Sequence, residues 1–226
     1  MSRVITESMA TTNTMSPENS LLFDHIANDL SERGYSVNHN ALPQQLSLEL
    51  LEQLHVMSRK EFDAAGIGRQ QDHMVDNSVR TDEICWIDGS SGAGEKWLAW
   101  SSELREYLNS QLFLGLFSFE SHFAHYGPGD FYKRHLDAFK GQSNRVLSIV
   151  VYLNVDWQPE DGGELVLYKD EEDVEGFKVS PSLGTVVAFL SEQFPHEVLP
   201  AARDRYSIAG WYRLNTSQPD RVDPPR

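Results

Sequence analysis

The chain has 226 residues and a mass of 25.7 kDa, which suits one large domain or two small ones. Apolar residues make up 40% of it, enough for a sizeable core, and the formal charge of −15 opposes binding to nucleic acid or to an anionic membrane surface. No apolar run approaches the roughly 20 residues of a membrane span, and the N-terminal residues lack the apolar centre of a signal peptide. Cys85 is the only cysteine, so no disulfide can form within the chain, and we expect a cytoplasmic protein.

The first expected elements are a helix and a short strand. Residues 1–19 are polar and are interpreted as a loose N-terminal tail. Ser16 followed by Pro17 is nevertheless a helix start, with serine as the cap and proline at the first helical position. Gly34 is expected to end this helix, and a short strand is expected at 35–37.

Two more helices follow, separated by a long loop. Apolar residues spaced along one face from Leu46 to Met57 predict a second helix that ends by Gly66. Residues 69–80 have no clean periodicity and predict a long loop. Trp97 lies early in a third helix, which is expected at about 95–113.

The second half of the chain has the sequence pattern of a β protein. Short apolar or alternating runs separated by turn residues predict strands, and strands after a helical first half indicate helices packed on one face of a β-sandwich or barrel. The fold class is therefore α+β, mainly β, with one domain at 20–213 and a C-terminal tail at 214–226. The expected strands are FSFESHFAHY, DFYKRH, RVLSIVVYLN, GELVLY, TVVAFL and RYSIAGWYR.

Three residues have the types and spacing of a metal site. His135 and Asp137 are two apart, so on a strand their side chains share one face. His196 stands beside another expected strand, 61 residues later. Two imidazoles and one carboxylate form the facial triad of non-haem Fe(II) oxygenases, which leaves coordination positions open.

Arg205, nine residues after His196, is expected inside the β-rich core. A buried guanidinium needs a carboxylate partner, because an unpaired buried charge is costly. A dicarboxylate cosubstrate supplies such a partner. A structural ion pair with a carboxylate of the protein is the alternative.

Several ordered segments resemble the 2-oxoglutarate- and Fe(II)-dependent prolyl 4-hydroxylases. Within that family they are most similar to the enzymes that hydroxylate hypoxia-inducible factor and to their bacterial relatives in pseudomonads. The resemblance spans about residues 68–213. The segments are Tyr126-Gly-Pro-Gly, Tyr132-Lys-Arg-His135-Leu-Asp137, Tyr152-Leu-Asn-x-Asp-Trp157, Gly162-Gly163, Pro195-His196-Glu-Val, Arg205-Tyr-x-Ile and Trp211-Tyr, with Arg80-Thr-Asp82-Glu-Ile84-x-Trp86 before them.

This resemblance implies a double-stranded β-helix, or jelly-roll, with supporting N-terminal helices. It also implies Fe(II), 2-oxoglutarate and O2, with ascorbate as a candidate reductant, and 4-hydroxylation of a peptidyl proline with release of succinate and CO2. By position, iron is held by His135, Asp137 and His196. The distal carboxylate of 2-oxoglutarate is held by Arg205 and Tyr152, and the residues lining the pocket are Tyr126, Ile84, Leu165 and Trp211.

The resemblance makes further predictions about the substrate and its loop. The segment 69–80 matches a mobile finger loop that folds over a bound peptide, and Asp82 and Arg145 occupy positions that pair at its base. The implied substrate is a protein with an exposed proline loop, with elongation factor Tu as the candidate, and the enzyme is expected to be a monomer that acts in oxygen sensing. His122 and Ala209 depart from the methionine and threonine of the animal enzymes.

Other functions remain open at this point. A jelly-roll could bind a metal without turnover, although such a protein has no need of a buried carboxylate clamp. A hydroxylase of free proline or of another small molecule is a second alternative, against which the long loop favours an extended protein substrate. A nucleic-acid demethylase is opposed by the net charge of −15.

Overall fold

The computed structural model describes residues 16–57, 59–65, 78–138 and 144–215. Most of the expected finger loop, including 69–77, lies outside the described residues, as does most of both expected tails. The boundaries of the domain at 20–213 therefore stay a prediction. Within the described ranges, no helix is long and apolar enough to cross a membrane.

The first helix follows the signals of its sequence. α1 (Pro17–Arg33) begins after Ser16, whose hydroxyl accepts a hydrogen bond from the Asn19 amide at 3.2 Å. It ends at Gly34, which adopts a left-handed conformation with φ of 80°. β1 (Tyr35–Asn38) follows at once, as expected.

The other two helices differ from expectation at their ends. α2 (Gln44–Val56) ends about ten residues before Gly66, because Met57 turns to an extended conformation without a glycine. The 3₁₀ turn η1 (Arg59–Glu61) and the short strand β2 (Asp63–Ala64) come next. α3 (Gly92–Leu112) starts three residues earlier than expected, because the Ser91 hydroxyl caps it by accepting from the Gly94 amide at 3.0 Å.

The remaining elements form two antiparallel sheets. The larger has the order β1-β9-β6-β11-β4-β3-β2, and the smaller has the order β5-β10-β7-β8. The strands β2, β8 and β10 are not among those expected from the sequence. The other elements are β3 (Glu83–Trp86), β4 (Ser118–Tyr126), β5 (Tyr132–His135), β6 (Arg145–Tyr152), η3 (Pro159–Asp161), β7 (Leu165–Leu167), β8 (Phe177–Val179), β9 (Val186–Leu190), β10 (His196–Val198) and β11 (Arg205–Arg213).

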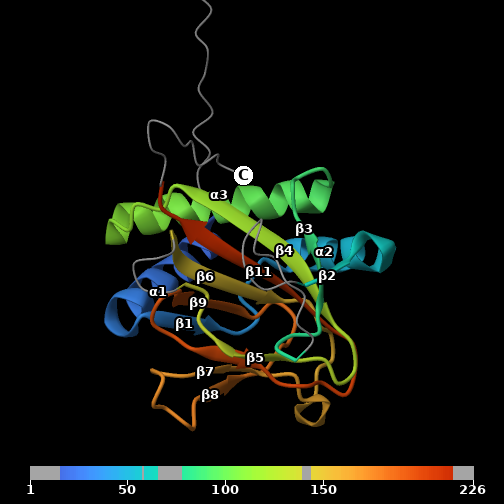
Figure 1. The fold of residues 1–226 in the computed structure, drawn as a ribbon. Coiled ribbons are helices and arrows are strands. Elements are labelled where there is room, and N and C mark those ends of the chain that lie inside the picture. The colour runs from blue at the N-terminus through green and yellow to red at the C-terminus, as the bar shows by residue number, and fades with distance from the viewer. Residues whose placement is uncertain (1–15, 58, 66–77, 139–143, 216–226) are drawn as a thin grey trace, which may run out of the picture.

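The helices and the small sheet lie on opposite faces of the large sheet (Figure 1). One apolar core joins α1, α2 and α3 to the large sheet and includes the fully buried Phe23, Trp97 and Tyr212. A second apolar cluster lies between the two sheets and includes Tyr152 and Phe189. The prediction of a mainly β, double-stranded β-helix with helices on one face is confirmed, and the inner faces of the two sheets position the site.

Candidate functional site

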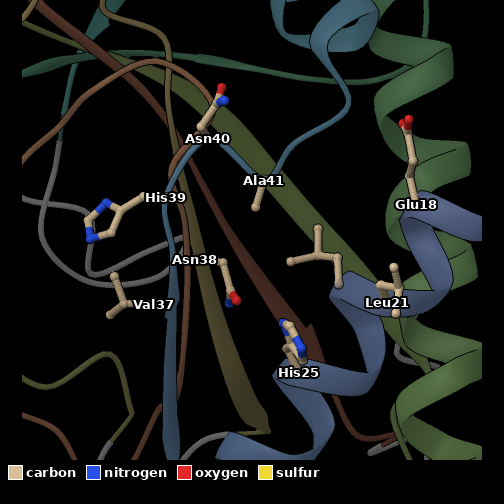
Figure 2. Close-up of a pocket in the computed structure, with 9 residues that line it drawn as sticks. Glu18, Leu21, His25, Val37, Asn38, His39, Asn40 and Ala41 are labelled. Carbon is tan, nitrogen blue, oxygen red and sulfur yellow. The ribbon is translucent and has the colours of Figure 1, made fainter.

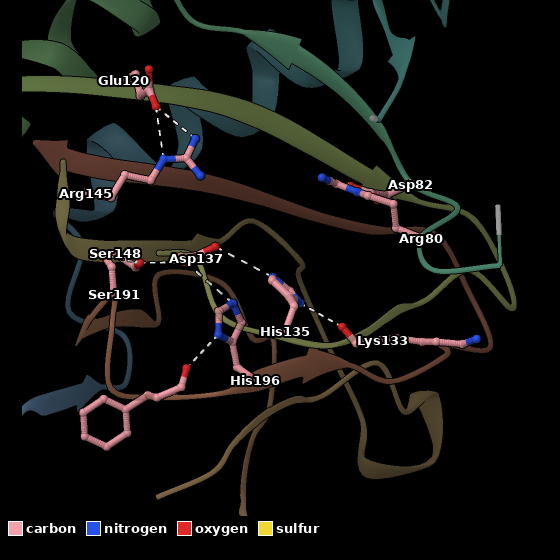
Figure 3. Close-up of polar contacts among 11 residues, drawn as sticks. Arg80, Asp82, Glu120, Lys133, His135, Asp137, Arg145, Ser148, Ser191 and His196 are labelled. Atoms are coloured by element: carbon pink, nitrogen blue, oxygen red, sulfur yellow. Dashed lines mark hydrogen bonds and ion pairs between the residues drawn. The ribbon is translucent and has the colours of Figure 1, made fainter. Parts of the chain in front are cut away.

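Two histidines face each other across neighbouring strands of the small sheet. His135 ends β5 and His196 begins β10; they are direct partners in the register, with ring centroids 4.3 Å apart. Each Nδ1 lies against a backbone carbonyl, of Lys133 at 2.8 Å and of Phe194 at 3.0 Å (Figure 3). A carbonyl oxygen only accepts, so each Nδ1 is the donor in its contact and each Nε2 is the ring nitrogen left to face a metal ion. Burial and the neighbouring His135 lower the pKa of His196 to about 4, so its ring is neutral near pH 7.

Asp137 completes the group from just beyond the end of β5. Its Oδ1 lies 3.7 Å from His135 Nε2 and its Oδ2 lies 3.6 Å from His196 Nε2. Burial alone raises the pKa of this carboxyl, but His196 and His135 outweigh it and hold the pKa well below the ordinary value. One ligand atom from each of the three residues lies within 4.8 Å of the others, so two imidazoles and a carboxylate can hold one divalent metal ion.

Arg205 lies at the start of β11 with its guanidinium in the interior. Its Nε donates to the carbonyl of Gly163 at 2.8 Å and its Nη1 donates to the hydroxyl of Ser207 at 3.3 Å. The guanidinium faces the rings of Tyr126 and Tyr152 at 4.9 and 5.1 Å. Only 1% of Arg205 is exposed, and no carboxylate of the described residues is within ion-pair distance of it.

Tyr152 has a buried hydroxyl that makes no hydrogen bond within the described part of the chain. Burial raises the pKa of Tyr152 to about 12, although Arg205 acts in the opposite direction, so the hydroxyl keeps its proton and can donate. A ligand carboxylate placed between Arg205 and Tyr152 would compensate the buried charge and accept a hydrogen bond from the Tyr152 hydroxyl. The two residues therefore fit a dicarboxylate such as 2-oxoglutarate, whereas a structural ion pair of Arg205 with the protein has no support among the described residues.

The residues expected to line the pocket lie on the inner faces of the sheets. Tyr126 and Leu165 are buried in the cluster between the sheets, and Ile84 packs against that cluster. Trp211 is on the same face of β11 as Arg205, six residues along an alternating strand. The indole Nε1 of Trp211 is buried without a hydrogen-bond partner in the described residues.

The two departures from the animal enzymes are neighbours in the large sheet. His122 on β4 pairs in register with Ala209 on β11. The buried His122 ring lies between Trp86 and Trp211, with centroid distances of 5.2 and 5.4 Å. Burial, together with the charge of Arg80, lowers the pKa of His122 to about 4, so this position presents a neutral imidazole.

The expected pair of Asp82 with Arg145 is wrong. Arg80 donates to both carboxylate oxygens of Asp82 at 2.8 and 2.6 Å, and Arg145 donates to Glu120 at 2.9 Å (Figure 3). The physical reason is the register of the sheet: the residue after Asp82 pairs near the end of β4, whereas Arg145 is in line with Ser118 at its start.

Sequence reasoning missed the aromatic contacts next to His135. The Tyr132 ring stacks on the His135 ring with centroids 3.6 Å apart, and the Arg80 guanidinium lies over the Tyr132 ring, 4.3 Å from its centroid. Next to His135 on β5, the Arg134 guanidinium lies 3.8 Å from the centroid of Tyr168. Aromatic and arginine residues adjacent to a metal-ligand motif are the signal that could have indicated these contacts.

Sequence reasoning also missed a serine pair beside Asp137. Ser148 donates to Asp137 Oδ2 at 2.6 Å, and the hydroxyls of Ser148 and Ser191 are 2.9 Å apart. The available signal is a single serine within the otherwise apolar residues 146–151 of β6, on the same face as Tyr152.

A cleft of about 470 Å³ lies elsewhere, between the first turns of α1 and the end of β1 (Figure 2). It is lined by His25 and His39 among other residues. Neither histidine belongs to the group that can hold a metal, so the cleft is separate from the site between the sheets.

Comparisons with known proteins agree with this geometry. The family model described as the 2OG-Fe(II) oxygenase superfamily matches residues 121–213. The crystal structure of a Pseudomonas putida prolyl-4-hydroxylase is 39% identical with a TM-score of 0.75, covering 85% of this chain and 98% of that one. A Trichoplax adhaerens prolyl hydroxylase, solved with a fragment of the hypoxia-inducible factor oxygen degradation domain, is 29% identical with a TM-score of 0.76, covering 87% of this chain and 90% of that one.

Curated relatives extend the same relationship to animals. The human Egl nine homolog 1 is 26% identical over 207 residues, which is 87% of this chain and 47% of the relative. A Caenorhabditis elegans hypoxia-inducible factor prolyl hydroxylase is 25% identical over 219 residues, 88% of this chain and 29% of the relative. The chain thus spans about half or less of the length of these two curated relatives. By its sequence, its fold and its His-Asp-His group, the chain belongs to the 2OG-Fe(II) oxygenase superfamily and, within it, to the prolyl hydroxylases.

Proposed function

We propose that this protein is a peptidyl-proline 4-hydroxylase that consumes 2-oxoglutarate and O2 and yields hydroxyproline, succinate and CO2. The observation that carries the proposal is the presence, between the same two sheets, of a His-Asp-His group and of a buried Arg205 that lacks a carboxylate partner in the described residues. A jelly-roll that only binds a metal has no use for the second feature.

One group of residues binds the metal and a second group binds the cosubstrate. His135, Asp137 and His196 hold the metal, and Arg205 and Tyr152 bind the distal carboxylate of 2-oxoglutarate. Ferrous iron, when bound with 2-oxoglutarate and O2, supplies the oxidising chemistry. The chain orients the cosubstrate and excludes water from it; the pocket is lined by Tyr126, Leu165, Ile84 and Trp211.

The proposed substrate is a cytosolic protein with an exposed proline loop. The Trichoplax adhaerens relative was solved with a peptide of a protein substrate, which supports a peptide rather than free proline. Elongation factor Tu, the target that the resemblance to bacterial relatives implies, is the first protein to test. The single Cys85, which has no partner for a disulfide within the chain, supports a reducing compartment.

The experiment is incubation of purified protein with Fe(II), 2-oxoglutarate and either elongation factor Tu or a cell lysate, followed by peptide mass spectrometry. We expect oxidised proline together with succinate, and loss of both when 2-oxoglutarate is omitted. His135→Ala and Asp137→Ala are expected to fold and to be inactive, because these ligands lie inside a barrel held by its apolar clusters. Oxidation of free proline in place of any peptide contradicts the proposed substrate class, and near-normal succinate formation by His135→Ala contradicts the metal site.

A further inference from the structure

Asp137 receives a hydrogen bond from the large sheet. It lies past the end of β5, outside the ladder of paired strands. Its Oδ2 accepts a hydrogen bond of 2.6 Å from the hydroxyl of Ser148, which lies in the middle of β6 (Figure 3). This bond crosses from the small sheet to the large one and contacts the carboxylate directly.

The directions of the hydrogen bonds around Ser148 follow from its chemistry. An ionised carboxylate only accepts, so the single hydroxyl proton of Ser148 is used on Asp137. In the 2.9 Å contact between the two serine hydroxyls, Ser191 must therefore be the donor. The result is an ordered chain from Ser191 to Ser148 to Asp137, in which each bond polarises the next.

Because the two serines are buried, their chain of hydrogen bonds takes the place of water at Asp137 Oδ2. Ser148 is 1% exposed and Ser191 is fully buried, so water has little access to replace either hydroxyl. The Ser148 bond occupies lone-pair capacity of Oδ2 and leaves Oδ1, the oxygen facing His135, free of any described hydrogen bond. A charge-assisted bond of this length fixes the rotation of the carboxylate.

We propose that Ser148, supported by Ser191, is a positioning residue that holds Asp137 so that Oδ1 binds the metal. This inference rests on the proposed function only in that it uses the same His-Asp-His group. Outer hydrogen bonds to metal ligands are generally worth about 10- to 100-fold in metal affinity.

The test measures metal binding without turnover, using Mn(II) as the probe and electron paramagnetic resonance to count the free ion. We expect Ser148→Ala to weaken Mn(II) binding by about 10- to 100-fold. Ser148→Thr retains the hydroxyl and should recover most of the affinity. Ser101→Ala is the matched control, because Ser101 is fully buried and its hydroxyl bonds within α3 to the Trp97 carbonyl.

The order of the hydrogen bonds, from Ser191 to Ser148 to Asp137, is tested by a double variant. Ser191→Ala leaves the bond of Ser148 to Asp137 in place and should weaken Mn(II) binding less than Ser148→Ala does. The double variant should match Ser148→Ala alone, since Ser191 acts through Ser148. Additive losses mean that the two serines act independently and contradict the chain.

The outcomes separate this proposal from the proposed function. His135→Ala should lose Mn(II) binding, and unchanged binding by this variant overturns the metal site itself. Loss in His135→Ala with unchanged binding in Ser148→Ala overturns the positioning role alone. Ser148→Ala could lower the unfolding temperature of the metal-free protein, in which case Ser148→Thr is the deciding variant. A threonine variant that folds but binds Mn(II) weakly contradicts a role for the hydroxyl.

Discussion

Arg205 is the residue whose replacement tests the cosubstrate site most directly. Its planar guanidinium donates through Nε and Nη1 to Gly163 and Ser207, and it can still present a donor to a ligand carboxylate. We expect Arg205→Lys to raise the 2-oxoglutarate requirement at least tenfold, equivalent to about 1.4 kcal/mol. Calorimetric titration of 2-oxoglutarate into Mn(II)-loaded protein measures this, and unchanged affinity indicates that Arg205 is structural.

The buried ion pair of Asp82 is expected to contribute more to the stability of the fold than an exposed ion pair does. Its side chain is fully buried and takes both hydrogen bonds from Arg80. Asp82→Ala is therefore expected to lower the free energy of unfolding by about 3 kcal/mol, as removal of one partner of a buried pair does. Glu49→Ala is the control, because its pair with Lys96 is at the surface and contributes little to stability.

Urea unfolding of the Asp82 and Glu49 variants gives the comparison. Equal losses would show that the Arg80–Asp82 pair is no more important than a surface contact. Arg80 also covers Tyr132, which stacks on His135, so Asp82→Ala should weaken Mn(II) binding as well.

The spacing of residues in the sequence was sufficient to predict the contacts of some site residues and not those of others. His135 and Asp137 are two apart in the chain, so their proximity could be inferred from the sequence. The partners of Asp82 could not, because they depend on the register of the large sheet and on a competing arginine two residues away. Ser148 carries no local signal of its partner, since the bond to Asp137 joins two sheets.

The turn between η3 and β7 holds Arg205 through its backbone. Gly163 has a φ of 69°, and a Cβ there would lie 2.8 Å from the Ala201 Cβ and 3.2 Å from the Arg205 Cδ. Gly163→Ala should lower the free energy of unfolding by about 1–3 kcal/mol and weaken 2-oxoglutarate binding, because Arg205 must move. Gly129→Ala is the matched control: its φ is 88°, but a Cβ there meets nothing within 4 Å.

Unfolding and 2-oxoglutarate titration of both glycine variants separate the two effects. Backbone strain is common to them, so a difference reports the clash at Gly163. If both lose stability equally and neither loses affinity, the turn does not position Arg205.

At the scale of elements, the sequence predicted what is locally encoded. Ser16, Pro17 and Gly34 set the ends of α1 without help from the rest of the chain. The end of α2 at Val56 was missed because no glycine or proline marks it. The strand β8 was missed because its three residues include an exposed lysine and do not form an apolar run like that of β7, and only pairing with β7 makes them a strand.

For the whole molecule, ligands that bind only the folded state raise its unfolding temperature by mass action. Mn(II) and 2-oxoglutarate, each at about 100 times its dissociation constant, should each stabilise the fold by about 2.7 kcal/mol. For a chain of this size that corresponds to an increase of about 5–10 °C for each ligand. Thermal scans of the wild type and of His135→Ala with both ligands measure it, and an equal increase in the two proteins contradicts binding at the proposed centre.

The His-Asp-His group draws on both sheets of the sandwich. His135 and His196 belong to the small sheet, whose strands have only three or four residues, whereas Asp137 is held by Ser148 of the large one. A divalent ion bound by all three side chains would link one sheet to the other. When the ion is scarce, the small sheet can open more readily and expose β5 and β10 to proteases. We therefore expect the lifetime of this protein in a cell to depend on the supply of iron as well as on its own sequence.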